Sequence, residues 1–105
     1  MSLEGLVQEA KAKLGDSLLE ARVVGARRVE LKVKAERLID AARFLKQSGF
    51  THPLSVAGVD YPDRGEIEVV YHVGRLEDKS VAALKANTPR DSPSLPSLRG
   101  VWLGV

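Results

Sequence analysis

The stretch from Gly49 to Val73, GFTHPLSVAGVDYPDRGEIEVVYHV, holds a turn, two candidate strands and the loop that joins them. Residues 66–73 place apolar side chains at every second position, which is typical of a strand with one buried face. Residues 54–60 are expected to form a strand of mixed sidedness, after an interruption at His52-Pro53. Within the loop, Pro62 fixes φ and Gly65 permits a left-handed conformation, so the loop is predicted to be a tight turn.

The residues on either side of this stretch extend the pattern of helices and strands. Apolar side chains at helical spacing follow Ser2, a plausible N-cap, and end at Gly15. A second helix is expected to end at Gly49. Residues 25–27 suit a hairpin turn. The predicted elements are helices over 3–14 and 35–48 and strands over 18–24, 28–34, 54–60, 66–73 and 79–86.

Residues 79–86 are open to two interpretations, because Ala82, Ala83 and Ala86 favour a helix while Val81 favours a strand. A strand is preferred, since a hairpin that continues from 66–73 is the shortest connection. The resulting order, α-β-β-α-β-β-β, predicts an α+β two-layer sandwich. Its helices would cover one face of a mainly antiparallel sheet.

The composition changes at Asn87. Pro89, Pro93 and Pro96 each remove a backbone donor and restrict the residue before them, which indicates an extended tail. The chain is therefore divided into an α+β domain over 1–88 and a docking tail over 89–105. The tail ends in apolar residues that include the only Trp, so it is expected to dock on its own domain or on a partner.

The composition limits the classes of function. A chain of 105 residues forms one domain, and the absence of Cys excludes disulfides and thiolate metal or iron–sulfur ligation. The formal charge of +2 comes from basic and acidic residues that are interspersed along the chain. A small nucleic-acid-binding α+β domain stays open as an alternative, on the basic pI of about 9.1. The scarcity of amide side chains and the absence of Cys indicate a thermophilic source.

The candidate chemical groups have ordinary structural explanations. His52 and His72 lack a metal-ligand spacing, and no Ser lies in a Gly-x-Ser-x-Gly context. Asp60 and Asp63 could serve acid–base chemistry together with His52, but turn formation explains the two carboxylates better. We therefore expect no catalytic, cofactor-binding or metal-binding residues, and the chain is not expected to be an enzyme on its own.

Three segments, taken in order, resemble the C subunit of the respiratory NADH–quinone oxidoreductase, complex I. The same family includes the matching subunits of membrane-bound NiFe hydrogenases and F420-type oxidoreductases. The segments are RLIDAARFLKQSGFTHPLSVAGVDYPDRG (37–65), EIEVVYHV (66–73), and SPSLPSL (92–98) followed by Val101-Trp102. Within the first, Asp60, Tyr61 and Pro62 match the family's loop. Members of the family continue past the tryptophan to a Glu-Arg-Glu motif, which is absent here, so the tail is expected to be truncated relative to the family.

The resemblance implies a non-catalytic subunit of the peripheral arm, without cofactors, that supports assembly with the large subunit of the quinone or hydrogenase site. It implies a cytoplasmic location on the inner face of the cell membrane, reached only through the complex, and no nucleic-acid partner. Trp is enriched at the centres of protein interfaces, which fits a docking role for the tail. The docking candidates are Leu95, Pro96, Leu98, Val101, Trp102 and Leu103.

Overall fold

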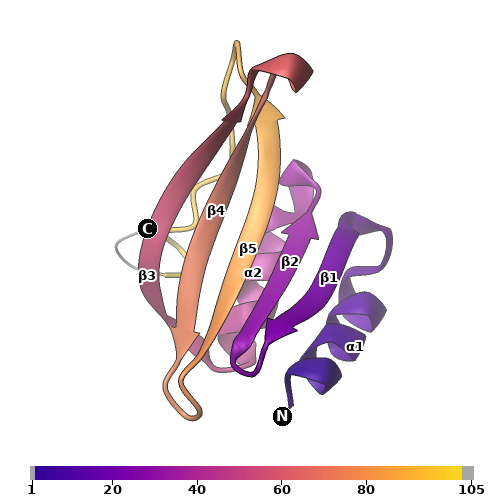
Figure 1. Cartoon of the computed structure of the whole chain (residues 1–105), viewed down its shortest axis with the longest axis vertical. Coiled ribbons are helices and arrows are strands. Elements are labelled where there is room, and N and C mark those ends of the chain that lie inside the picture. Colours follow the sequence, from indigo (N-terminus) through magenta and orange to yellow (C-terminus); the bar gives the residue numbers. More distant parts are fainter. Residues whose placement is uncertain (1, 103–105) are drawn as a thin grey trace.

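The computed structural model describes residues 2–102 of the chain. Within them, two α-helices and five strands follow the predicted order, with three short 3-10 turns between them (Figure 1). The helices and strands are α1 (Leu3–Leu14), β1 (Leu18–Gly25), β2 (Arg28–Val33), α2 (Leu38–Gln47), β3 (Phe50–Tyr61), β4 (Glu66–Arg75) and β5 (Ser80–Pro89). The 3-10 turns are η1 (Gly15–Ser17), η2 (Ala35–Arg37) and η3 (Pro62–Arg64).

The five strands form one sheet in the order β1-β2-β5-β4-β3. Three neighbouring pairs are antiparallel, and only β2 and β5 run parallel, with Leu31 opposite Leu84. The prediction of a mainly antiparallel α+β fold is confirmed, and so is the choice of a strand rather than a helix for residues 79–86. The parallel pair arises because β5 inserts between the β1–β2 hairpin and β4, at the centre of the sheet.

Several predicted boundaries were wrong. Helix α2 begins at Leu38 rather than at residue 35, because Ala35–Arg37 form a 3-10 turn, and β4 continues past Val73 to Arg75, which pairs with Ser80. Strand β3 begins at Phe50, so His52-Pro53 does not interrupt it. The chain accommodates the proline with two shifts in the β3–β4 register, between Phe50 and His52 and between Pro53 and Ser55, as is usual for proline in a sheet. Strand β5 extends to Pro89 rather than ending at Ala86, because the ladder with β4 continues through Asn87.

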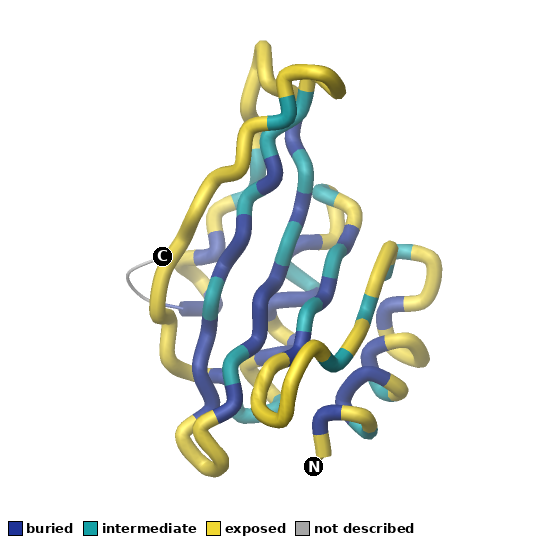
Figure 2. The backbone as a smooth tube through the Cα atoms, in the orientation of Figure 1, coloured by how far each residue is buried: buried dark blue, intermediate teal, exposed yellow. Residues whose placement is uncertain are grey.

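The core lies on one face of the sheet, where the helices pack. Helix α1 begins at Ser2, whose Oγ accepts a hydrogen bond of 3.0 Å from the Gly5 amide. Its apolar stripe and that of α2 are buried against the inward side chains of β2, β4 and β5. The other face has no helix over it in Figure 1, and β3 is exposed along most of its length in Figure 2. No helix among residues 2–102 is long and apolar enough to cross a bilayer.

Candidate partner-binding surface

The tail after β5 folds back onto the domain. Leu98, Val101 and Trp102 are at most 6% exposed and belong to the same core as the helices and the sheet. The Trp102 indole Nε1 donates a hydrogen bond of 2.8 Å to the carbonyl oxygen of Phe50, at the start of β3. Of the two possibilities left open for the tryptophan, docking on its own domain is the one observed.

The start of the tail is fixed by a threonine at the end of β5. The Thr88 hydroxyl donates to the Ser94 carbonyl at 3.1 Å and accepts from the Ser94 amide at 2.8 Å. Thr88 is buried, so both hydrogen bonds are shielded from water. Nothing in the local sequence signals this contact, because it depends on the chain reversing after Pro89.

The six docking candidates fall into three groups. Leu98, Val101 and Trp102 are covered by the chain itself. Leu95 and Pro96 are half-buried, and Leu95 packs on the edge of the core, so both keep surface for a partner. Leu103 lies outside the described residues. A role of these residues in binding a partner stays a prediction.

The loop that carries the family resemblance lies at the projecting end of the sheet, beyond the helices (Figure 1). Pro62 opens η3 and Gly65 closes it with a φ of 65°, as the turn prediction required. Asp60 accepts a hydrogen bond of 2.8 Å from the Arg90 Nε, and the Arg64 guanidinium lies 5.0 Å from the centre of the Tyr61 ring. The loop residues therefore stabilise the turn and tie it to the start of the tail.

A buried arginine that the sequence analysis missed, Arg75, joins the opposite end of the sheet to the end of α2, where its Nη1 donates to the Ser48 carbonyl oxygen at 3.3 Å. Arg75 is 4% exposed, donates to both carboxylate oxygens of Asp78, and lies 4.8 Å from the centre of the Phe50 ring. The hydrogen bonds from Arg75, followed by those from Ser80, hold the pKa of Asp78 well below its usual range. The bond to Asp78 in turn raises the pKa of Arg75. The signal available in sequence was the position of Arg75 on the inward face of β4, next to a turn with an acid three residues on.

The open face of the sheet carries charges of both signs in a partly buried network. Glu30 on β2 accepts from the Arg22 Nη2 at 3.0 Å and lies 3.3 Å from the Lys85 Nζ. Burial works to raise the pKa of Glu30, but its bonds to Arg22 and Lys85 outweigh burial and lower that pKa. Lys32 reaches across β5 to Glu68 on β4, at 2.9 Å. Basic side chains here are matched by acidic ones, which does not favour the nucleic-acid alternative.

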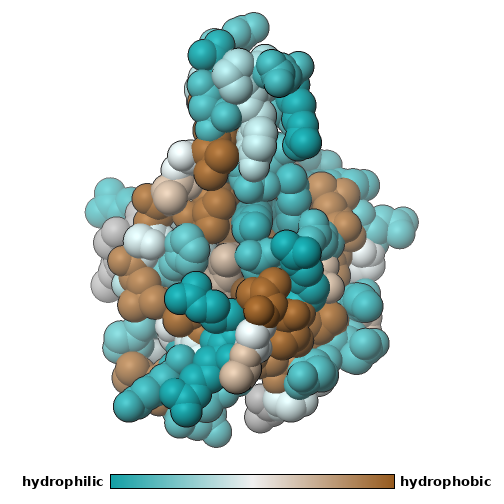
Figure 3. Space-filling view, viewed as in Figure 1, coloured by the Kyte–Doolittle hydropathy of each residue, from teal (hydrophilic) through white to brown (hydrophobic). Residues whose placement is uncertain are grey.

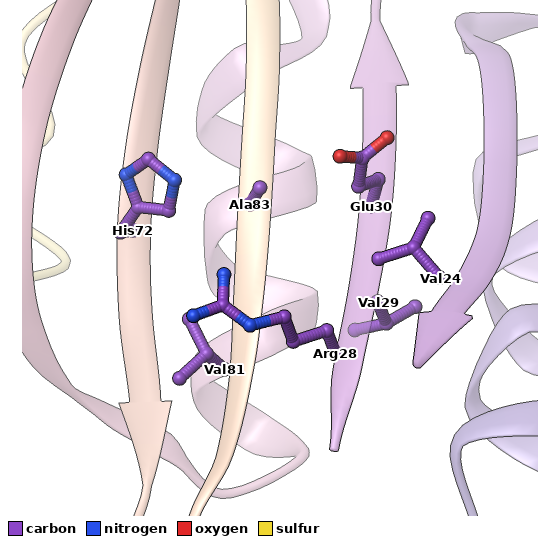
Figure 4. Close-up of a pocket in the computed structure, with 7 residues that line it drawn as sticks. All are labelled: Val24, Arg28, Val29, Glu30, His72, Val81 and Ala83. Carbon is purple, nitrogen blue, oxygen red and sulfur yellow. The ribbon is translucent and has the colours of Figure 1, made fainter. Parts of the chain in front are cut away.

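A small hollow opens on this face above β5 (Figure 4). Its volume is about 40 Å³, room for a water molecule or two and far below the several hundred Å³ of ordinary ligand pockets. Its lining residues are Val24, Arg28, Val29, Glu30, His72, Val81 and Ala83. Around it, Figure 3 shows apolar and polar patches alternating over the open face, whereas the projecting end of the sheet is hydrophilic. This surface suits contact with a protein better than enclosure of a substrate.

The candidate chemical groups do not converge. His52 and Asp60 both lie on β3, where a rise of about 3.3 Å per residue puts them about 25 Å apart. His72, on the outward face of β4, contacts the Ser55 hydroxyl at 3.1 Å. Within residues 2–102 no group of three or more His, Asp and Glu side chains is gathered as a metal site would require. An acid–base site built from His52, Asp60 and Asp63 is excluded by this geometry.

Comparison with known proteins places these features in a family. The family model "Respiratory-chain NADH dehydrogenase, 30 Kd subunit" matches residues 31–105. The C subunit of the F(420)H(2) dehydrogenase of Methanosarcina mazei is 34% identical over 103 residues, which are 97% of this chain and 65% of that protein. The C subunit of the NADH-quinone oxidoreductase of a Roseiflexus species is 34% identical over 105 residues, covering 95% of this chain and 59% of the relative. The chain thus spans about 60% of the length of these relatives.

Solved structures share the fold. A chain of the membrane-bound sulfane sulfur reductase, an archaeal respiratory membrane complex, superposes with a TM-score of 0.83 at 33% identity, over 94% of this chain and 58% of that one. A trypsin-resistant fragment of Nqo5 gives a TM-score of 0.75 at 24% identity, over 97% of this chain and 82% of that fragment. The family resemblance noted from the sequence is confirmed: the chain belongs to the family of the 30 kDa subunit of respiratory-chain NADH dehydrogenase.

Proposed function

We propose that the chain is a non-catalytic subunit of the peripheral arm of a complex I-like NADH–quinone oxidoreductase. The observation that carries the proposal is the family match over residues 31–105, supported by 34% identity to proteins named as the C subunits of such enzymes. The chain would act by binding the large subunit that lines the quinone site, on the inner face of the cell membrane.

A second candidate is the corresponding subunit of a complex with another electron donor or acceptor. It is supported by the relative from the F(420)H(2) dehydrogenase and by the structural likeness to the sulfane sulfur reductase. The role of the chain would be the same in either complex. An affinity tag on the chain in its natural host, followed by assays of the purified complex with NADH and with reduced F420, separates the two candidates.

The docking role of the tail requires a substitution outside the fully buried core, in a variant whose melting temperature shows that it is folded. Deleting residues 92–105 would remove Leu98, Val101 and Trp102, so loss of binding could reflect unfolding. Leu95→Ser instead changes a half-buried side chain at the tail surface, and Leu76→Ser, at a side chain that is 68% exposed, is its control. If the tail docks, Leu95→Ser lowers the recovery of the large subunit and Leu76→Ser does not. Equal recovery with both variants removes the tail from the interface, and a tagged chain that recovers no other part of an oxidoreductase refutes the proposed function.

A further inference from the structure

Strand β3 is the exposed edge of the sheet. Within residues 2–102, no segment pairs with its outer side, since the sheet order ends at β3. Every residue from Thr51 to Asp60 is exposed, as Figure 2 shows along the left side of the sheet. Leu54, Val56 and Val59 are 58%, 51% and 40% exposed. Exposed apolar side chains that gather on one element mark an interaction site more often than single ones do.

The second half of this edge lacks the features with which proteins usually prevent pairing with another chain. Such edges normally carry charged side chains, proline or bulges, or are covered by a helix or a loop; in β3 the proline and both register shifts lie before Ser55. No Lys, Arg, Asp or Glu occurs from Thr51 to Val59. The opposite edge, β1, carries Glu20 and Arg22 and has α1 packed alongside it (Figure 1). The chain therefore protects one edge of its sheet and leaves the other able to accept a strand.

The part of β3 that can accept a strand is its second half. From Ser55 to Tyr61 the ladder with β4 runs without a register shift, which gives about 20 Å of regular edge. The first half contains Pro53, which has no amide to donate, and both register shifts. A partner segment of five or six residues matches the regular half.

A second copy of this chain fits the edge poorly. Antiparallel pairing of two copies about Gly58 would place the Asp60 carboxylate opposite Val56 twice, next to apolar groups. Pairing about Val56 would place Pro53 opposite Val59, within the irregular half of each strand. A segment from a different protein can place a polar side chain opposite Asp60 and need not repeat Pro53, so it avoids both conflicts.

We propose that an extended segment of another subunit of the complex adds to the sheet beside Ser55–Tyr61 as a sixth strand. The backbone groups of that half of β3 supply the hydrogen bonds, as in other cases of strand addition. Val56 and Val59 project to opposite faces of the sheet, so apolar side chains on both faces of the incoming strand contact them. This inference rests on the proposed function, because it takes the occupant from the complex.

The test compares hydrogen exchange in the free chain and in the complex purified through a tag on this chain. In the free chain, the amides of Ser55–Tyr61 that point away from β4 exchange rapidly. In the complex we expect every second amide of this segment to slow by at least about 100-fold, because strand addition pairs alternate backbone groups. Side-chain contact alone does not produce that alternation.

Two substitutions probe the same edge. Val56→Lys together with Val59→Lys places charges on the edge and is expected to lower recovery of the complex by at least tenfold, whereas Leu76→Lys leaves recovery unchanged. If the edge variant is poorly folded, the exchange measurement on the unmodified complex still decides. A complex that forms without slowed exchange at alternate amides overturns the inference and leaves the proposed function intact. If protection from exchange in the free chain increases with its concentration, the edge binds a second copy, and the inference is overturned as well. If no complex is recovered, both proposals are overturned.

Discussion

Replacement of Trp102 tests whether the tail belongs to the folding unit. The side chain is 2% exposed and its indole donates to the Phe50 carbonyl oxygen. Truncating a buried tryptophan to alanine costs about 3–5 kcal/mol, and the Phe50 carbonyl also loses its donor. We take a loss of about 4 kcal/mol in the free energy of unfolding. At about 2.1 cal/mol/K per residue, 105 residues have an unfolding entropy near 0.22 kcal/mol/K, so Trp102→Ala should lower Tm by about 18 °C.

Circular dichroism measures the melting of the wild type and each variant, and the fluorescence of the single Trp adds a local probe in the wild type. Both signals should melt together, because the tail and the sheet share one core. Trp102→Phe keeps an aromatic ring but removes the donor, and we expect it to cost about 1–2 kcal/mol. Leu76→Ala, at a side chain that is 68% exposed, should change stability by less than about 0.5 kcal/mol. A decrease in Tm below about 3 °C for Trp102→Ala, or tryptophan emission that changes well before the sheet melts, would refute the placement of the tail in the core.

Three further predictions concern residues that stabilise a turn, an ion pair and the start of the tail. Gly49 has a φ of 98°, and an added Cβ would lie 2.9 Å from the Arg75 Cδ. Gly49→Ala should therefore lower the free energy of unfolding, measured by denaturant melts, by about 1–3 kcal/mol. The control Gly100→Ala should leave it almost unchanged, because nothing lies within 4 Å of the added Cβ. Asp78→Asn should cost about 1–2 kcal/mol at pH 7, a figure reduced because the carboxylate is 43% exposed. The folded pKa of Asp78 lies below its ordinary value of 3.8, so the carboxylate contributes fully to the free energy of unfolding above that value. This contribution is lost as the pH falls below about 4. If Asp78→Asn keeps the wild-type dependence of stability on pH in that range, Asp78 does not make this contribution. Thr88→Val removes both hydrogen bonds to the tail backbone, so proteolysis within residues 90–97 should become faster under conditions in which the domain stays folded. An unchanged cleavage rate would show that these bonds do not hold the tail.

The local pattern of the chain was sufficient to predict its elements. Helix α1 has its N-cap, its apolar stripe and its terminating glycine at the predicted positions. The alternation over 66–73 correctly placed Tyr71 and Val73 on the buried face of β4. Each of these signals lies within a few residues, where side-chain spacing and backbone preference act directly. The boundary at Pro53 failed because a bulge, which depends on the neighbouring strand, can accommodate a proline that local rules treat as a break.

In the candidate partner-binding surface, too, some features were predictable from local residues and others depend on tertiary contacts. Pro62 and Gly65 predicted a turn from their own backbone preferences, and the turn is present. Sequence reasoning left two places for Trp102, because an apolar tail is stabilised equally by its own domain or by a partner. The exposed edge at β3 could not be foreseen, since it depends on which strands become neighbours. The alternation along β4 indicated an inward Arg75, but its contact with the Phe50 ring depends on the pairing of β3 with β4.

The order and type of the helices and strands, the tight turn and the family were predictable from the sequence, because they depend on local spacing and on residues matched one by one. The parallel pairing of β5 with β2, the burial of the tail in the core and the open edge at β3 became known from the folded arrangement. Strand pairing and burial are contacts between residues far apart in the chain. Their free energy depends on the whole arrangement rather than on any one segment. The stretch from Gly49 to Val73 illustrates both cases. Its turn was predictable from Pro62 and Gly65 alone, whereas its first strand, β3, is exposed because the order of the sheet places it at an edge.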